Sequence, residues 1–334
     1  MKYREMGPEP ASINTALVLS GGGAKGAYQV GVIVQLMKYG IDFNLVTGSS
    51  IGAFNGALLA EFINTGLDRR SIGKKMKDVW LEVNNFISFN WSGFLCNLCN
   101  PLDIPSIFSN NMIKKTLMKY IPSSRKFSDY TVCQLSITAT NLTKKKLEIF
   151  DYNSSVSVIK AVLASMAYPV GFPVVQIKDD FYIDGGALSN TPLKEAILWG
   201  SENIYIVFLT PLSLIEGDSE REEEKNSFSA VEVIEEFIEL ASNNLMYGDL
   251  KRAAKINRLI KLINRYENKL PDKFLMDLRN LFDLKYGEGK RVINIKKIAP
   301  RHLLIPPGLT GFDNNTAIKE IMQKGEEDAL QVFG

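Results

Sequence analysis

Histidine is almost absent from this sequence of 334 residues, which contains only His302. A Ser-His-Asp hydrolase needs an imidazole between its serine and its aspartate. Any serine chemistry in this chain must therefore use His302 or do without histidine. His302 stands beside Arg301 and before an apolar run, and we interpret it as a surface or packing residue rather than a catalyst.

Cysteine is also scarce, with three residues in the whole chain. An odd number in a chain of this length does not indicate a disulfide framework and is typical of a reducing compartment. Cys96 and Cys99 have the spacing of a metal or redox motif, but a structural zinc site needs four ligands. Only Cys133 and His302 remain to complete such a site, so we expect no metal.

Long apolar runs and a strong net charge are missing as well. No stretch reaches the roughly 18 apolar residues of a membrane span, and the run at 16–19 is too short for the core of a signal peptide. The formal net charge of +2 gives no global field that would recruit nucleic acid or an anionic membrane. We therefore expect a soluble, cytoplasmic protein that binds no nucleic acid.

The sequence does contain an alternation of strand-like and helix-like segments. Residues 16–20 and 44–48 predict strands, each followed by a turn containing glycine and then by a helix, at 27–39 and 53–65. This order is a βαβ unit and favours a parallel sheet covered by helices. Further strands are predicted at 134–141, 147–151, 181–184 and 204–209, with a helix at 156–166. We expect a three-layer α/β/α fold with a mostly parallel central sheet.

The ends of the chain differ in composition from this core. We predict an N-terminal tail over residues 1–15, a core over 16–212 and a helical C-terminal extension over 213–334 that packs on the same core. An aromatic stretch within 84–110 indicates either a cap over an acyl-chain pocket or a small hydrophobic cluster. In the extension we expect helices at 229–247, 250–266 and 315–333, and a strand pair at 292–298 and 302–305.

Basic residues recur among aliphatic ones in the predicted helix at 250–266. They are Lys251, Arg252, Lys255, Arg258, Lys261 and Arg265. This combination occurs in helices that rest on lipid and in helices that pack on their own core with a solvated basic face. We favour the second interpretation and leave transient contact with a membrane surface open.

The segment Gly48-Ser49-Ser50-Ile51-Gly52 lies between a predicted strand and a predicted helix. That is the context of a nucleophile elbow, a tight turn that exposes its central serine at a helix N-terminus. Glycine is needed two positions before and after Ser50 because side chains there would collide. Ser50 is therefore the candidate nucleophile, and an ordinary glycine-rich turn is the alternative.

A second glycine-rich turn follows the first strand and consists of Gly21, Gly22, Gly23, Ala24, Lys25 and Gly26. Successive glycines let neighbouring amides point the same way and bind an anion. The same residues match the dinucleotide fingerprint Gly-x-Gly-x-x-Gly, so an oxidoreductase is an alternative. That alternative requires an acidic residue at the end of the second strand, whereas Asp42 precedes this strand. A glycine loop beside an exposed serine is more simply interpreted as an oxyanion hole facing a nucleophile.

A base for the serine is the component still missing. Asp184-Gly185-Gly186 follows the strand predicted just before it, so the carboxylate lies at a strand end and the two glycines let the chain pass close by. Taken alone, such a segment is more often a plain turn.

In combination, these segments resemble the patatin-like phospholipase family. The resemblance rests on the glycine loop, on the turn around Ser50 with Ala53 and Asn55-Gly56 after it, and on Asp184-Gly185-Gly186 with Asn190-Thr191-Pro192 downstream. Residues 138–142 and 164–173 resemble the family's central strand and the segment before its aspartate. The similar segments occur in the family's order over 17–192, and the likeness thins beyond residue 211.

The resemblance implies a lipid acyl hydrolase with a Ser-Asp dyad, no catalytic histidine and no cofactor. Ser50 would attack the ester of a lipid or phospholipid, Asp184 would take its proton, and amides of the glycine loop would hold the oxyanion. An aspartate with a pKa of about 3.9 is a weak base for a serine, so we expect Asp184 to be partly desolvated. A non-catalytic lipid-binding protein with the same fold is the alternative.

Overall fold

The computed structural model describes residues 15–82, 88–89, 106, 108–169, 171–216, 230–266, 269, 271, 273–274, 277, 292–305, 312 and 314–333. The predicted N-terminal tail before residue 15 and most of the aromatic stretch at 84–110, with Cys96 and Cys99, lie outside the described residues. The segments that carry the sequence motifs around Ser50 and Asp184 lie within them.

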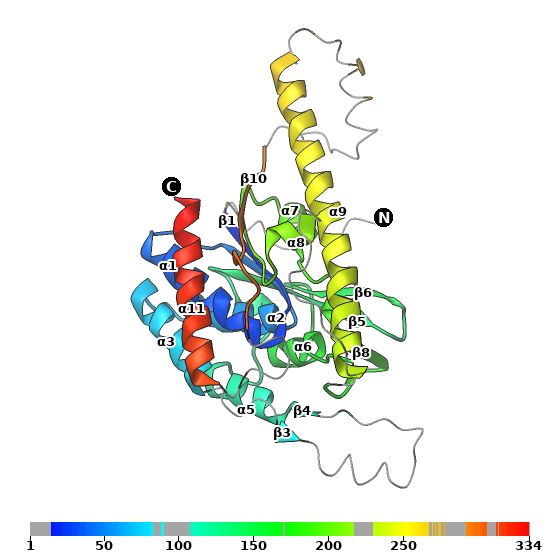
Figure 1. Ribbon diagram of the computed structural model, residues 1–334. Coiled ribbons are helices and arrows are strands. Elements are labelled where there is room, and N and C mark those ends of the chain that lie inside the picture. The colour runs from blue at the N-terminus through cyan, green and yellow to red at the C-terminus, as the bar shows by residue number, and fades with distance from the viewer. Residues whose placement is uncertain are drawn as a thin grey trace.

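A mixed sheet of eight described strands forms the centre of the fold (Figure 1). The strands follow the order β10-β9-β1-β2-β5-β8-β7, with β6 beside β5. Parallel pairs join β1 (Thr15–Leu19), β2 (Leu45–Ser49), β5 (Gln134–Asn141), β9 (Asn203–Val207) and β10 (Asn294–Ile298). Antiparallel pairs add β6 (Lys146–Phe150), β7 (Val175–Ile177) and β8 (Asp180–Asp184). The connections from β5 to β6 and from β7 to β8 are too short for a crossover, so these strands pair as hairpins.

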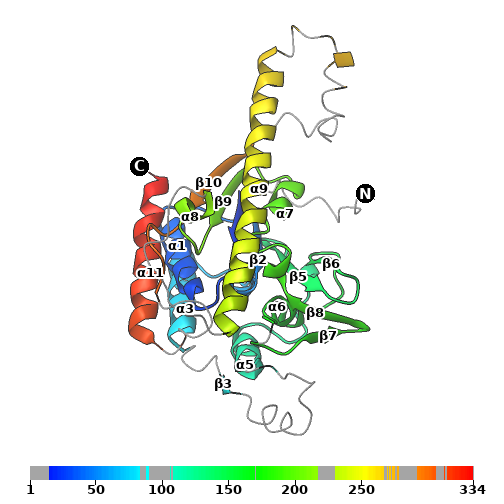
Figure 2. The ribbon, with the colours of Figure 1, turned by 45° about the vertical axis from the view of Figure 1, so that its right-hand side comes forward.

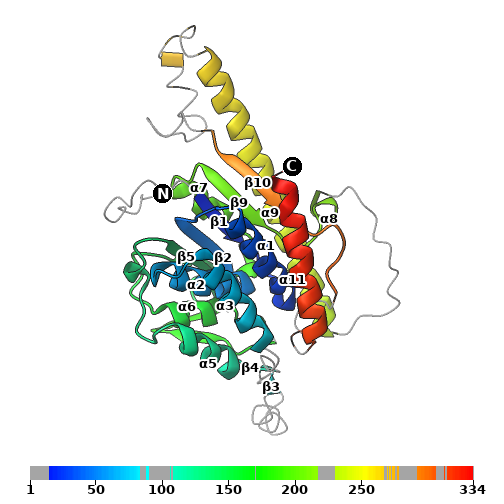
Figure 3. The ribbon, with the colours of Figure 1, turned by 90° about the vertical axis from the view of Figure 1, so that its left-hand side faces the viewer.

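Helices cover both faces of the sheet (Figures 2 and 3). One face carries α1 (Ala27–Lys38), α2 (Ile51–Asn64), α3 (Arg69–Glu82), α6 (Val158–Ser165) and α11 (Asn315–Ala329), with α5 (Asn111–Tyr120) below them. The other face carries α7 (Leu193–Leu198), α8 (Leu212–Glu216) and α9 (Ala230–Tyr266).

The side chains of β1 alternate between the two helical layers, as the pleat of a strand requires. Leu17 and Leu19 belong to the core on the α1 side, whereas Ala16 and Val18 belong to the core on the α9 side. Each face of the sheet therefore has its own hydrophobic core. This arrangement confirms the predicted three-layer α/β/α class, with a sheet that is mixed.

The chain beyond residue 213 contributes to this same fold. Strand β10 pairs with β9, and α11 packs so closely on α1 that a Cβ atom at Gly31 would lie 1.9 Å from the Met322 carbonyl oxygen. A Cβ atom at Gly325 would lie 2.2 Å from the Tyr28 carbonyl oxygen. Because glycine has a hydrogen atom in place of a side chain, α1 and α11 can approach each other closely at these two positions. The domain boundaries themselves stay a prediction.

Two predictions for this region were wrong. Residues 230–266 form one helix, α9, of 37 residues, where two helices were predicted. A glycine inside a helix costs only about 1 kcal/mol, and Met246, Leu250 and Ala253 on both sides of Gly248 are buried against the same core. Residues 302–305 form no strand, and β10 pairs in parallel with β9 instead. Although α9 is long, no helix in the described part of the chain is apolar enough to cross a membrane.

Candidate active site

Ser50 occupies a tight turn between the end of β2 and the first residue of α2, Ile51. Its backbone has φ 53° and ψ −124°, a strained conformation for a residue other than glycine, which costs on the order of 1–3 kcal/mol. A Cβ atom at Gly48 would lie 2.4 Å from the Gly52 carbonyl oxygen, and one at Gly52 would lie 2.3 Å from the Leu19 carbonyl oxygen. Both glycines are therefore required sterically, and the turn presents Ser50 at the positive end of α2.

The register of the sheet explains why Asp184 lies next to this turn. Strand β2 runs parallel to β5 and ends where Ser49 lies opposite Thr138. Strand β8 runs antiparallel to β5 and ends where Asp184 lies opposite Ala139. Since β6 pairs with residues 137–141 of β5, the strands β2 and β8 must share its other edge. The two strands thus meet end to end, and their last residues face each other.

Gly185 continues the chain through this meeting point. A Cβ atom there would lie 2.4 Å from the Thr138 carbonyl oxygen and 2.6 Å from the Ser49 hydroxyl oxygen. No side chain fits in that space. The glycine after Asp184 therefore allows the two strand ends to come together.

Asp184 is buried, with 2% of its surface exposed. Its Oδ1 atom accepts a hydrogen bond of 2.7 Å from the Gly186 amide. Burial raises the pKa of its carboxyl to about 6, while the Ser50 hydroxyl and the Gly186 amide lower it. Among the described residues, Oδ2 has no partner that meets the usual limits of a hydrogen bond, so the contact with Ser50 is looser than a full bond. Asp184 is thus a buried carboxyl group that burial makes more basic than an ordinary aspartate.

The glycine loop begins beside Ser50, because a Cβ atom at Gly21 would lie 3.0 Å from the Ser50 Cβ atom. The Gly21 amide donates to the Asn190 carbonyl oxygen at 3.0 Å and lies 3.1 Å from Asn190 Oδ1. The Lys25 amide donates to the Gly22 carbonyl oxygen. Within the described residues, the amides of Gly22, Gly23 and Ala24 have no acceptor. The candidate oxyanion donors therefore narrow to these three.

A buried polar network holds the far end of the loop. The Asn55 side-chain amide donates to the Gly26 carbonyl oxygen at 3.0 Å and to Gln29 Oε1 at 2.9 Å. Gln29 Nε2 in turn donates to the Ser20 carbonyl oxygen, and Trp80 Nε1 donates to Asn55 Oδ1. Since Gln29, Asn55 and Trp80 are fully buried, the network fixes the loop without help from solvent.

Ser165 and Asn190 contribute to the site although sequence reasoning gave them no role. The Ser165 hydroxyl accepts the Ser50 amide at 2.8 Å and donates to the Thr138 carbonyl oxygen at 2.7 Å. Asn190 lies between Gly21 and Gly186, since its Oδ1 is 3.0 Å from the position of a Cβ atom at Gly186. Both residues stand inside segments that resemble the family, which was the only available signal.

The other residues considered as candidates lie away from Ser50 and Asp184. His302 is exposed, and in the described part of the chain it makes no hydrogen bond or ion pair. Cys133 is buried, and burial raises the pKa of its thiol.

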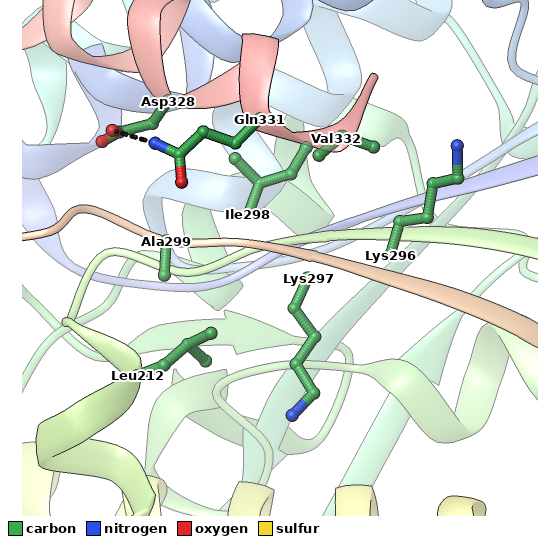
Figure 4. Close-up of a pocket in the computed structure, with 8 residues that line it drawn as sticks. All are labelled: Leu212, Lys296, Lys297, Ile298, Ala299, Asp328, Gln331 and Val332. Atoms are coloured by element: carbon green, nitrogen blue, oxygen red, sulfur yellow. Dashed lines mark hydrogen bonds between the residues drawn. The ribbon is translucent and has the colours of Figure 1, made fainter. Parts of the chain in front are cut away.

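A hollow of about 320 Å³ lies between β10 and the end of α11, lined by Leu212, Lys296, Lys297, Ile298, Ala299, Asp328, Gln331 and Val332 (Figure 4). Strands β9 and β1 separate β10 from β2, so this hollow does not belong to the Ser50 site.

Comparison with known proteins gives matches over more than half of this chain. The lysophospholipase NTE1 of Lodderomyces elongisporus is 27% identical over 194 residues, which cover 57% of this chain and 12% of that protein. Patatin-like phospholipase domain-containing protein 7 of Rattus norvegicus is 27% identical over 193 residues, covering 58% of this chain and 13% of that protein. This chain thus matches about an eighth of the length of these relatives.

Among solved structures, VipD from Legionella pneumophila is similar with a TM-score of 0.44 and 14% identity, over 96% of this chain and 67% of that one. The profile of the patatin-like phospholipase family matches residues 17–197, which is more than half of the chain and includes Ser50 and Asp184. The chain therefore belongs to the patatin-like phospholipase family.

Proposed function

We propose that this chain is a lipid acyl hydrolase that cleaves carboxylic esters, with Ser50 as nucleophile and Asp184 as general base. The observation that carries the proposal is the end-to-end meeting of β2 and β8, which puts a buried carboxyl beside a serine on a strained turn. With a pKa of about 6, that carboxyl is mostly ionised at neutral pH and is a stronger base than an ordinary aspartate.

In the proposed first step, Ser50 Oγ attacks the carbonyl carbon of the ester while its proton passes to Asp184. The oxyanion of the tetrahedral intermediate lies against the amides of Gly22, Gly23 and Ala24 and the N-terminus of α2. One such donor typically contributes about 3 kcal/mol to the transition state. Collapse of the intermediate expels the alcohol, which takes the proton back from Asp184, and leaves an acyl group on Ser50.

In the proposed second step, water attacks the acyl-enzyme while Asp184 accepts a proton from it. The carboxylic acid then leaves and the proton returns to Ser50. The two half-reactions use the same base and the same oxyanion donors, so neither a metal nor a cofactor enters the scheme.

The substrate class is proposed from the family and from the activity that the relatives' names state. The fungal relatives are named lysophospholipases, but this chain matches only 12% of their length. We therefore propose phospholipid or lysophospholipid esters as the class, without choosing a head group.

The proposal is tested by labelling the protein with a fluorophosphonate probe and by turnover of a short-chain nitrophenyl ester. We expect one probe per molecule, located on Ser50 by peptide mass mapping, and ester hydrolysis that Ser50→Ala abolishes. His302→Ala serves as the matched control and should retain activity. Folded wild-type protein that neither takes the probe nor hydrolyses the ester contradicts the proposal, and so does loss of activity in folded His302→Ala.

A further inference from the structure

One exposed face of α9 changes from apolar to basic along the helix. Val233, Phe237 and Leu240 are 53%, 70% and 56% exposed. Lys251, Lys255 and Arg258 follow them at matching intervals and are also exposed. Since an α-helix has about 3.6 residues per turn, positions 18 apart return to the same side of the helix. We call the face formed by these six residues the outer face of α9.

The outer face is not needed to hold α9 in place. Met246, Leu250 and Ala253 are buried in the core on this side of the sheet. Ile260 and Ile263, which accompany the basic residues, are also buried. These contacts agree with the interpretation of 250–266 as a helix packed by its aliphatic residues. The apolar residues of the outer face are a separate set that lies further upstream.

The apolar half of α9 lies beside the candidate active site. The helix contacts the turn at Gly185–Ala187, which follows Asp184. Thr191, a short distance further along, donates a hydrogen bond to the Met246 sulfur at 3.0 Å. Leu188, directly after the turn, is 42% exposed and adds to the apolar surface. The C-terminal end of the helix extends beyond the sheet, on the side away from this turn (Figures 1 and 2).

We propose that the outer face of α9 docks on the surface of an anionic lipid bilayer. Val233, Phe237 and Leu240 enter the interfacial region, as apolar side chains of surface helices do. Lys251, Lys255 and Arg258 contact phosphate-bearing head groups, and their charge identifies the partner surface as anionic. Four glutamates, Glu232, Glu235, Glu236 and Glu239, stand among the apolar residues in the sequence, and only Glu236 has i+3 or i+4 spacing to two residues of the outer face.

This inference rests on the proposed function, because docking would bring lipid esters to Ser50. A helix that is apolar near the site and basic away from it holds the site against the membrane and lets the charged half reach head groups.

The test is flotation of the full chain with vesicles of phosphatidylcholine, with and without phosphatidylserine. We expect binding to the anionic vesicles that weakens with added salt. Lys255→Glu with Arg258→Glu should lower the affinity about thirtyfold or more, since each basic residue near an anionic surface strengthens binding severalfold. Lys319→Glu with Lys324→Glu, on exposed positions of α11, makes the same charge change on the opposite layer and should bind as wild type.

The apolar half is tested in the same way with Phe237→Ser and Leu240→Ser. The double variant should lose vesicle binding and hydrolysis of vesicle phospholipid, yet turn over the soluble nitrophenyl ester at the wild-type rate. Val132→Ser is the control, because Val132 is 60% exposed and precedes β5 at the end of the sheet away from Ser50. Unchanged soluble-ester turnover also shows that each variant is folded.

Three outcomes overturn the inference while leaving the proposed function standing, provided that the soluble ester is still hydrolysed. Wild type does not float with anionic vesicles, or both α9 variants float like wild type. Alternatively, the wild type is a dimer by light scattering that Phe237→Ser with Leu240→Ser converts to a monomer, which would make this face an interface between copies. Vesicle binding without any ester hydrolysis would instead contradict the proposed function alone.

Discussion

Glu61 and Asp184 are both buried carboxylates, each 2% exposed, but the residues around them differ. Glu61, near the end of α2, accepts two hydrogen bonds from the Arg125 guanidinium, at 2.9 and 2.6 Å, and one from the Tyr130 hydroxyl, at 3.0 Å. Asp184 receives one full hydrogen bond, from the Gly186 amide, and a looser contact from Ser50. No cation of the described residues pairs with it. Glu61 therefore has the surroundings of a structural group, whereas those of Asp184 suit the general base that we propose.

The two sites show that burying a carboxylate has different consequences, depending on how far its desolvation penalty is compensated. Removing a carboxylate from water is unfavourable, and a cation with several hydrogen bonds offsets the penalty. Where Arg125 supplies that compensation, the carboxylate fixes the segment at residue 125 to α2. Where compensation is incomplete, burial raises the pKa of Asp184 and leaves the carboxylate able to accept a proton.

Replacing Asp184 should have the largest effect on activity. In Asp184→Asn the base is absent, and we expect ester hydrolysis to fall by about a thousandfold or more. The same change should stabilise the protein by about 1–3 kcal/mol at neutral pH. The pKa of Asp184, raised to about 6, means that ionising this carboxyl in the folded state lowers the free energy of unfolding, and asparagine carries no such charge. This loss of stability grows as pH rises through the window between the ordinary value and about 6.

Kinetics and denaturant unfolding on the same preparation measure both quantities. A destabilised Asp184→Asn protein would mean that the carboxylate is a structural group like Glu61. An Asp184→Asn protein with near wild-type turnover would remove it from the chemistry.

Replacing Glu61 should give the opposite result. Glu61→Gln leaves the Arg125 guanidinium without its anion, and we expect a loss of about 2–3 kcal/mol in the free energy of unfolding. Turnover per folded molecule should stay unchanged, because Glu61 lies near the end of α2 remote from Ser50. Denaturant unfolding compared with active-site titration separates the effect on stability from the effect on turnover. A lower turnover number at equal folded fraction would show that Glu61 is not a purely structural group.

Replacing Ser165 should have a smaller effect, confined to the site. Its hydroxyl joins the Ser50 amide to the Thr138 carbonyl oxygen. In Ser165→Ala both buried groups lose a partner, which should lower kcat about tenfold by relaxing the turn around Ser50. Ser165→Thr keeps the hydroxyl and should recover part of that loss, with KM little changed in both variants. Equal activities in the alanine and threonine variants would show that the hydroxyl does not position Ser50.

The sequence predicted the elements whose signals are local. Apolar runs gave β1, β2, β5 and β9 within one or two residues, and glycine spacing predicted the turn around Ser50. The predicted membership of the family was confirmed, and so was the α/β/α class. These features depend on neighbours along the chain, which is why a single sequence is enough to find them.

The features that the sequence did not reveal depend on contacts between distant segments. The meeting of β2 with β8 depends on how each pairs with β5, which no local pattern specifies. Ser165 lies 115 residues from Ser50, and Asn190 lies 169 residues from Gly21. Helix α9 is continuous because its buried residues on both sides of Gly248 pack on one core, and tertiary packing outweighs the weak local break.

The central claim is that Ser50 is activated by Asp184 without an imidazole. The most direct measurement is the pH dependence of the rate at which a fluorophosphonate labels Ser50, in wild type and in Asp184→Asn. An ionised carboxylate is the active form, so the wild-type rate should fall as pH decreases through about 6. The Asp184→Asn protein should label far more slowly and show no such midpoint. A midpoint near 6 that persists in Asp184→Asn would contradict the account.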